Sequence, residues 1–126
     1  MQVDIVTPDK ILFSDASASM VTVPGIEGQM GILDDHVPVV TFLKPGVINV
    51  EAKENKYFFT TGGVVDFKNN SLSILCQEVY DIKDLSPEKI QELKQKADKT
   101  KSDDSTDHDV FIANTLIDEL NSLQVK

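Results

Sequence analysis

The sequence predicts a mainly β N-terminal sandwich or flattened barrel, residues 1–84, followed by a C-terminal α-helical hairpin, residues 85–126. Three observations support this fold class. Short β-rich runs fill the first part and are separated by turn signals roughly every 8–12 residues, which is typical of a sandwich or barrel. The composition changes near Asp84. Two amphipathic helical patterns follow that change.

The strands are expected wherever β-branched and aromatic residues gather between turn signals such as Pro45-Gly46 and Asn69-Asn70. In the last run Leu72, Ile74 and Cys76 alternate with polar residues, which is the period of a half-buried strand. The predicted strands span residues 3–7, 16–23, 37–42, 47–51, 56–61, 64–67 and 71–76.

The segment from Pro24 to His36 contains three of the six glycines, Gly25, Gly28 and Gly31. Glycine permits positive φ angles and close approach to another surface. We therefore expect a long, shaped loop between two strands here. Loops of this kind carry function more often than cores do, so this loop is the leading candidate for a functional surface.

The sequence of residues 85–126 predicts two helices. Ser86-Pro87 places a capping serine and a first-turn proline at the start of the first helix. A polar stretch over residues 101–107 is expected to form a loop, and the second helix is expected to begin near Asp107 or Asp109. Few apolar residues support these helices, so we expect the hairpin to dock onto the sandwich or a partner. The apolar stripes are Ile90, Leu93 and Ala97, and then Ile112, Ala113, Leu116, Ile117, Leu120 and Leu123.

The charge balance excludes several partners. The net charge is −9, and all 12 basic residues are lysines. Arginine is the preferred residue for recognising phosphates and bases, so we expect no nucleic acid partner. No apolar run approaches the roughly 20 residues that span a bilayer, and the N-terminus does not resemble a signal peptide, so we expect no direct membrane insertion. The lone cysteine, Cys76, is consistent with a reducing compartment.

Catalytic and metal-binding patterns are not found. No Gly-rich loop ends in Lys-Ser or Lys-Thr, and no serine lies in a nucleophile elbow. His36 follows Asp34-Asp35, and His108 lies between two aspartates, but neither has a second His or Cys at ligand spacing. We therefore expect no enzyme, no bound metal and no cofactor.

A series of short motifs, in one order along the chain, resembles the epsilon subunits of bacterial F-type ATP synthases, which correspond to the mitochondrial delta subunits. The hairpin matches that family in architecture more than in sequence. The motifs are Val6-Thr7-Pro8 with Leu12-Phe13, Val23-Pro24-Gly25, Glu27-Gly28, Gly31-Ile32-Leu33, His36-Val37-Pro38, Leu43-Lys44-Pro45-Gly46, Gly62-Gly63 and Ile74-Leu75.

The resemblance implies a non-catalytic rotor subunit of the central stalk, which couples the c-ring to the gamma subunit of a proton-translocating synthase. It implies a peripheral location on the cytoplasmic face of the bacterial inner membrane, through the complex. It also implies that the glycine-rich segment faces the ring. The residues that it assigns to the contact with the c-ring or gamma are Glu27, Gly28, Gln29, Met30, Gly31 and His36. The competing interpretation is a loop shaped only for its own sandwich.

The sequence also departs from the family. Gln29 stands where many members have an acidic residue, and Asp34-Asp35 stands where many have Pro-Gly. Of the ATP-binding motif of some members only Ile90 and one basic residue, Lys94, remain, so we expect no nucleotide binding. The acidic second helix predicts only weak regulation of ATP hydrolysis through transient contact with the catalytic alpha and beta subunits. The alternative function is a free-standing β-sandwich module that binds a small ligand or peptide.

Overall fold

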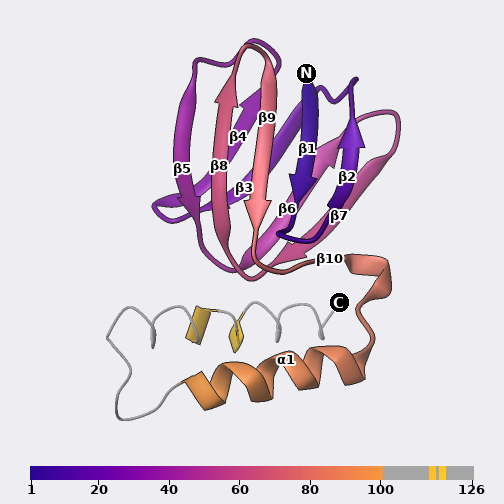
Figure 1. Cartoon of the computed structure of the whole chain (residues 1–126), viewed down its shortest axis with the longest axis vertical. Helices are drawn as coiled ribbons and strands as arrows, with labels where there is room; N and C mark the ends of the chain where they lie inside the picture. Colours follow the sequence, from indigo (N-terminus) through magenta and orange to yellow (C-terminus); the bar gives the residue numbers. More distant parts are fainter. Residues whose placement is uncertain (101–113, 116, 119–126) are drawn as a thin grey trace. The chain divides into compact units, whose positions relative to one another are not determined.

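The computed structural model describes residues 1–100, 114, 115, 117 and 118. The chain divides into two compact units, Met1–Ile82 and Lys83–Lys126, and each is described by itself. The first unit contains ten β-strands and the second contains helix α1 (Figure 1). Within the described part of the chain, no helix combines the length and the apolar content needed to cross a membrane.

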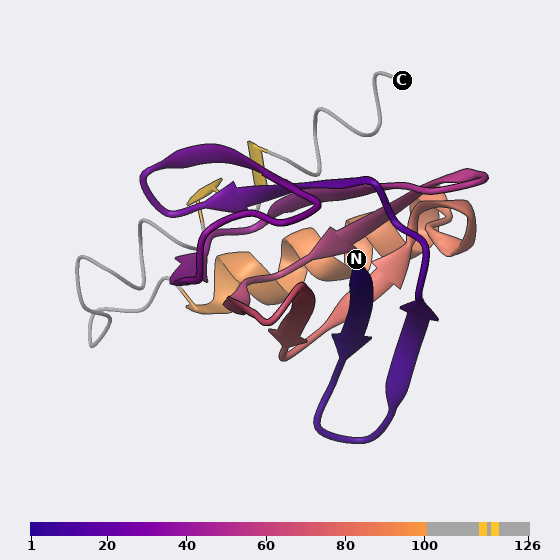
Figure 2. The same cartoon turned by 90° about the horizontal axis from the view of Figure 1, so that it is seen from above.

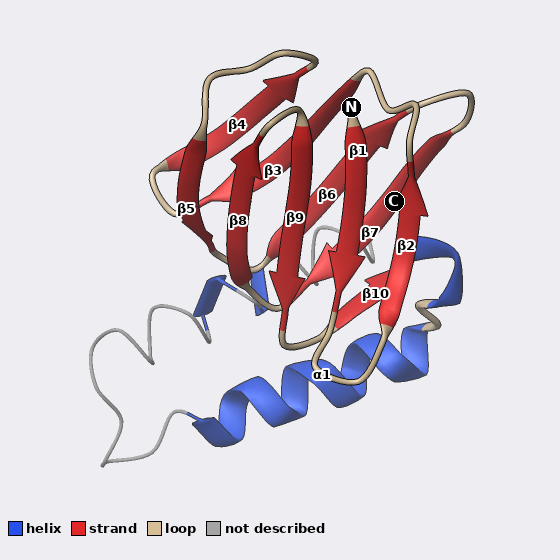
Figure 3. Ribbon diagram, turned by 45° about the horizontal axis from the view of Figure 1, so that its top comes forward, coloured by secondary structure: helices blue, strands red, loops and turns tan. Residues whose placement is uncertain are grey.

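The strands of the first unit form two layers, as Figure 3 shows. One layer has the strand order β5-β8-β9-β1-β2, and the other has β10-β7-β6-β3 with β4 paired to β3. The layers join where Gly25, at the end of β3, pairs with Leu43 of β5. This arrangement confirms the predicted N-terminal sandwich. The strands are β1 Gln2–Val6, β2 Ile11–Asp15, β3 Met20–Gly25, β4 Gly28–Leu33, β5 Val39–Leu43, β6 Gly46–Glu51, β7 Asn55–Thr60, β8 Gly63–Lys68, β9 Ser71–Cys76 and β10 Val79–Asp81.

The core lies between the two layers and is formed by alternate residues of the strands, as strand geometry requires. Leu72, Ile74 and Cys76 are buried, so the alternation predicted for β9 is confirmed. The rings of Phe13 and Phe58 pack with their centroids 5.2 Å apart. Strand β1 lies beside β2 (Figure 2) and is antiparallel to it, but β1 runs parallel to β9 on its other side.

The prediction of a long loop over residues 24–36 is wrong. Strand β3 continues to Gly25 and pairs with β4, Gly28–Leu33, so most of the segment is a β-hairpin. The composition suggested a loop, whereas pairing with β3 gives the backbone of β4 its hydrogen bonds. Strands β2 and β10 were also not predicted from the sequence, and β3 begins at Met20 rather than at residue 16.

In the second unit, α1 spans Pro87–Thr100 and follows a short 3-10 helix, Ile82–Asp84. The amide of Lys89 donates to Oγ of Ser86 at 3.2 Å, which confirms the predicted serine cap. Ile90 and Leu93 are buried, as expected for the apolar stripe of this helix. Residues 114, 115, 117 and 118 are helical, and the rest of the predicted second helix lies outside the described residues.

Candidate functional site

The turn between β3 and β4 is an exposed part of the segment that the sequence singled out. Gly25 pairs with Gly28, and Ile26 and Glu27 form the tip between them. Gly28 has a φ of 138°, a conformation that residues with a side chain rarely adopt. The tip therefore presents one carboxylate, that of Glu27, and the apolar side chain of Ile26, which is 39% exposed.

The tip is held firmly by backbone contacts. The amide of Ile26 donates to the carbonyl of Phe42 at 3.0 Å, and the amide of Lys44 donates to the carbonyl of Pro24 at 3.0 Å. These bonds tie both sides of the tip to the end of β5. A Cβ added at Gly25 would lie 2.7 Å from the carbonyl oxygen of Gly28, so there is no space for a side chain at residue 25. Backbone hydrogen bonds thus hold the tip against the end of β5.

The structure distributes the other predicted site residues differently. Gln29 is exposed on β4, next to the tip, and Gly31 is half-buried further along the same strand. The side chain of Met30 is half-buried and packs against the hydrophobic core. Met20 of β3 pairs with Leu33, while Gly25 pairs with Gly28, so the two ends of β4 lie at opposite ends of the sandwich.

His36 therefore lies at the opposite end of the sandwich from Glu27, and the structure does not bring the two together. The imidazole Nδ1 donates to the carbonyl of Val37 at 2.6 Å. Its ring meets Phe67 edge-on, with centroids 5.9 Å apart. The predicted surface from Glu27 to His36 is thus divided between two ends.

The end near His36 is organised by a polar cluster around Asp34. One carboxylate oxygen accepts hydrogen bonds from the Met1 ammonium at 3.0 Å and from Nδ2 of Asn70 at 2.7 Å. Oδ1 of Asn70 accepts from the amide of Asp35 at 2.8 Å. The hydrogen bond from the ammonium, followed by that from Asn70, lowers the pKa of Asp34. Hydrogen bonds from Ser17 likewise lower the pKa of Asp15 at this end.

Sequence reasoning missed a row of apolar side chains on the outer face of the sheet β5-β8-β9-β1-β2. The row crosses neighbouring strands in register: Phe42, Val64, Leu75, Val6 and Ile11. Each of these residues stands beside another apolar residue in its strand, for example Val64 beside Val65. Such pairs are typical of strands that are covered on both faces, and they were the available signal.

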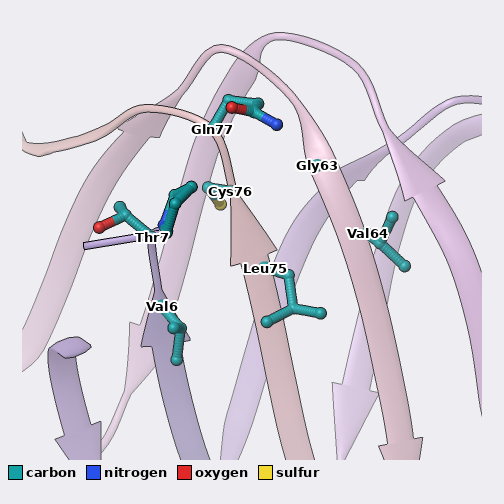
Figure 4. A pocket seen from close by; sticks show the side chains of 8 residues that line it. Val6, Thr7, Gly63, Val64, Leu75, Cys76 and Gln77 are labelled. Carbon is teal, nitrogen blue, oxygen red and sulfur yellow. The ribbon is translucent and has the colours of Figure 1, made fainter. Parts of the chain in front are cut away.

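Near the middle of this row the surface is hollowed (Figure 4). The hollow has a volume of about 430 Å³ and lies among Val6, Pro8, Val64 and Leu75, with Cys76 at its floor. Burial raises the pKa of the Cys76 thiol. No charged side chain of the described residues lines the hollow, so it is suited to apolar contact and not to acid–base chemistry.

Comparisons with known proteins match the sandwich, and some of the matches also include residues beyond it. The family model described as "ATP synthase, Delta/Epsilon chain, beta-sandwich domain" matches residues 1–82. The ATP synthase epsilon chain of Pelagibacter ubique is 39% identical over 124 residues, which cover 97% of this chain and 95% of the relative. The mitochondrial ATP synthase subunit delta of Schizosaccharomyces pombe is 33% identical over 118 residues, which cover 90% of this chain and 71% of the relative.

Solved structures share the fold. A chain of the mitochondrial ATP synthase of Euglena gracilis, in the OSCP/F1/c-ring assembly, superposes with a TM-score of 0.76 at 19% identity, covering 97% of this chain and 79% of that one. A chain of the central stalk and c-ring of the Tetrahymena thermophila mitochondrial ATP synthase superposes with a TM-score of 0.73 at 18% identity. The match covers 97% of this chain and 94% of that one.

The fold defines a protein class, a two-layered β-sandwich followed by a helical segment. Among the described residues there is no cluster of three or more potential metal ligands. The family model and the relatives narrow that class. The chain belongs to the ATP synthase delta/epsilon family, as its sequence motifs predicted. It is a subunit of an assembly and not an enzyme in its own right.

Proposed function

We propose that this chain is a rotor subunit of the central stalk of a proton-translocating F-type ATP synthase, where its sandwich couples the c-ring to the gamma subunit. Family membership and the relatives along nearly the whole chain support this proposal. In it, the protein lies at the cytoplasmic face of the bacterial inner membrane and is held there through the complex.

The observation that carries the coupling role is the tip of the β3–β4 hairpin, which backbone hydrogen bonds hold against the end of β5. A subunit that transmits torque needs a contact that does not yield, and this tip is fixed by two backbone hydrogen bonds to the end of β5. Glu27 presents an exposed carboxylate there, and Gln29 presents an exposed amide beside it. Such groups suit the polar loops of a ring of c subunits, and we propose that they form that contact. His36, at the other end of the sandwich, is left out of it.

The alternative, a free-standing module for a small ligand or peptide, has no support from the comparisons. The named relatives are subunits of one assembly, and the Pelagibacter protein matches 97% of this chain. The hollow beside Leu75 is apolar and carries no charged group to fix the orientation of a ligand.

The proposal is tested by adding the purified chain to ATP synthase that lacks this subunit, in membrane vesicles from the same organism. Wild-type chain should bind and restore ATP-driven proton pumping. The variant Glu27→Lys should weaken binding by about tenfold, because it places a cation where a carboxylate makes a partly desolvated contact.

The matched control is Glu54→Lys. Glu54 is an exposed glutamate in the turn between β6 and β7, at the opposite end of the sandwich. This variant should bind within about twofold of wild type. Failure of the wild-type chain to bind would contradict the rotor role, whereas equal binding of both variants would contradict only the assignment of the tip.

We further propose that the C-terminal segment regulates hydrolysis only weakly and does not bind ATP. Ile90 of the motif remnant is buried in α1, and Lys94 is half-buried, which argues against a nucleotide contact there. A truncation that ends at Asp84 should change ATP hydrolysis by the complex less than about two- to threefold, a barrier change under roughly 0.7 kcal/mol. Tenfold or larger activation would show that the segment is a strong inhibitor.

A further inference from the structure

The amine of Met1 belongs to the polar cluster around Asp34 and has no role in the coupling contact at the hairpin tip. Its ammonium makes a buried hydrogen bond to the carbonyl of Ala18 at 2.8 Å and lies 3.0 Å from Oδ1 of Asp34. The side chain of Met1 is buried in the hydrophobic core. A charge that leaves water in this way is stable only when other groups pair with it, and here two acceptors do so.

The amine joins the two layers of the sandwich. Met1 leads into β1 of one layer, whereas Ala18 precedes β3 and Asp34 follows β4 in the other layer. Asn70, in the turn between β8 and β9, donates to the same carboxylate oxygen of Asp34 at 2.7 Å. Three connections between strands thus converge around one ammonium.

This arrangement requires an amine that carries no acyl group. An acyl group turns the ammonium into an amide, which removes the positive charge and leaves a single N–H donor. One donor cannot fully satisfy both the carbonyl of Ala18 and the carboxylate of Asp34. The acyl group would also have to fit beside a side chain that is already buried in the core. Hydrogen bonds to charged groups stabilise more than neutral ones, so the loss should be large.

An acyl group is present on this nitrogen when synthesis starts. In bacteria and mitochondria, translation begins with N-formylmethionine, whose nitrogen belongs to an uncharged formamide. Its removal is a hydrolysis: water adds to the formyl carbon, the C–N bond breaks, formate leaves and the amine takes up protons. Excision of the methionine itself generally needs a small second residue, whereas residue 2 is glutamine. Excision would also shift the amine by one residue, about 3.3 Å along β1.

We propose that the nitrogen of Met1 is a modification site, from which the formyl group must be hydrolysed before the two layers of the sandwich can close stably. The protein then keeps Met1, and its free ammonium binds Asp34 and the carbonyl of Ala18. The inference is independent of the rotor role proposed above. It makes the stability of this subunit depend on a deformylating hydrolase.

Chemical synthesis of the full chain tests the requirement. Because Cys76 is the one cysteine, a synthetic segment 1–75 can be ligated to segment 76–126 without changing the sequence. The chain with an Nα-formyl group should have an unfolding equilibrium constant about 30-fold higher than the chain with a free amine, measured in urea at pH 7. The matched control carries an acetyl group on Nζ of Lys10, an exposed residue between β1 and β2. It loses the same charge and should stay within about twofold of the unmodified chain.

A double-mutant cycle tests whether the charge on the amine acts through Asp34. In the variant Asp34→Asn, the formyl group should raise the unfolding constant by about fivefold or less, because the partner of the ammonium is already uncharged. An equal effect of formylation in wild type and in Asp34→Asn would overturn the proposed pairing. If the formylated chain does not fold at all while the chain acetylated at Lys10 folds, the requirement for a free amine is supported.

The natural protein provides a second, independent measurement. Intact-mass and N-terminal fragment spectra of the subunit, isolated from its own cells, should show Met1 with a free amine. A formyl group, an acetyl group or a further residue on the nitrogen of Met1 would overturn the proposal, as would loss of Met1. A formylated synthetic chain that is as stable as the unmodified chain would overturn it as well.

Discussion

At the end of the sandwich that carries Ile26 and Glu27, the strands meet through bare backbone. A Cβ at Gly63 would lie 2.1 Å from the carbonyl oxygen of Leu75, closer than any side chain allows. At the opposite end the segments meet through side chains, with Asn70 and the Met1 ammonium both bonded to the carboxylate of Asp34. One end depends on the absence of side chains and the other on their charge and hydrogen bonds.

This difference predicts different sensitivities. Backbone packing contains no group that titrates, so the end with the hairpin tip should keep its shape over a wide range of pH and salt. Among the described carboxylates, Asp15 and Asp34 have a lowered pKa, and both lie at the opposite end. The tip that we propose as the contact with the c-ring thus lies at the end that we expect to be least affected by solution conditions.

The largest effect is expected for Gly63→Ala. The added methyl group collides with the backbone of β9, and we expect the free energy of unfolding to fall by about 3 kcal/mol or more in urea titrations. The control is Gly31→Ala, where the added Cβ would meet only the terminal methyl group of Met20, at 3.0 Å. That flexible side chain can move, so the cost should stay below about 1 kcal/mol. Equal costs would contradict the backbone packing described here.

An intermediate effect is expected at the polar end for Asn70→Gly. Asn70 has a positive φ of 57°, which glycine adopts freely, so the substitution removes the amide without straining the backbone. The lost hydrogen bonds should cost about 1–2 kcal/mol of unfolding free energy. Asn69→Gly, at a φ of 51°, is the control and should change stability by less than about 0.5 kcal/mol. A smaller loss of stability at residue 70 than at residue 69 would contradict the stabilising role of the Asn70 hydrogen bonds.

A smaller, pH-dependent effect is expected for Asp34→Asn. The pKa of Asp34 in the folded protein lies below its ordinary value of 3.8. Its carboxylate therefore stabilises the fold above about pH 4, and that contribution is lost as the pH falls through the folded pKa. Urea midpoints of wild type and variant should differ at neutral pH and converge in acid. A difference between the two midpoints that stays constant from neutral pH into acid would contradict this role of the Asp34 carboxylate.

The smallest effect is expected from removing the second unit. A truncation that ends at Asp84 should unfold cooperatively with a sheet-like circular dichroism spectrum, because all strands of the described residues lie before Asp84. The contrast between Gly63→Ala and Asn70→Gly should persist in the shortened chain. A molten or aggregating fragment would show that the sandwich does not fold alone.

Local patterns in the sequence predicted local structure well. The alternation of Leu72, Ile74 and Cys76 placed these residues inside, and Ser86 with Pro87 marked the start of α1. Both signals act within a few residues of each other, because strand alternation and helix capping are properties of short segments. The family was also recognisable from short motifs, and the comparisons confirmed it.

Features that depend on pairing between distant strands were not predicted. Glycine and proline made residues 24–33 look like a loop, although pairing with β3 makes most of them β4. Glu27 and His36 are close in sequence, yet an extended strand of six residues, about 20 Å long, separates them. The apolar row becomes visible only once the registers of five strands are known, because its members are scattered from residue 6 to residue 75.

The parallel pairing of β1 with β9 has a consequence for synthesis on the ribosome. Val3 of β1 pairs with Leu72 of β9. Strand β1 therefore lacks one of its two partner strands until nearly the whole sandwich has been translated. At about 5–20 residues per second, the chain from Val3 to Leu72 takes roughly 4 to 14 seconds to add. Val3 and Ile5 thus remain without their partners in β9 for seconds during synthesis.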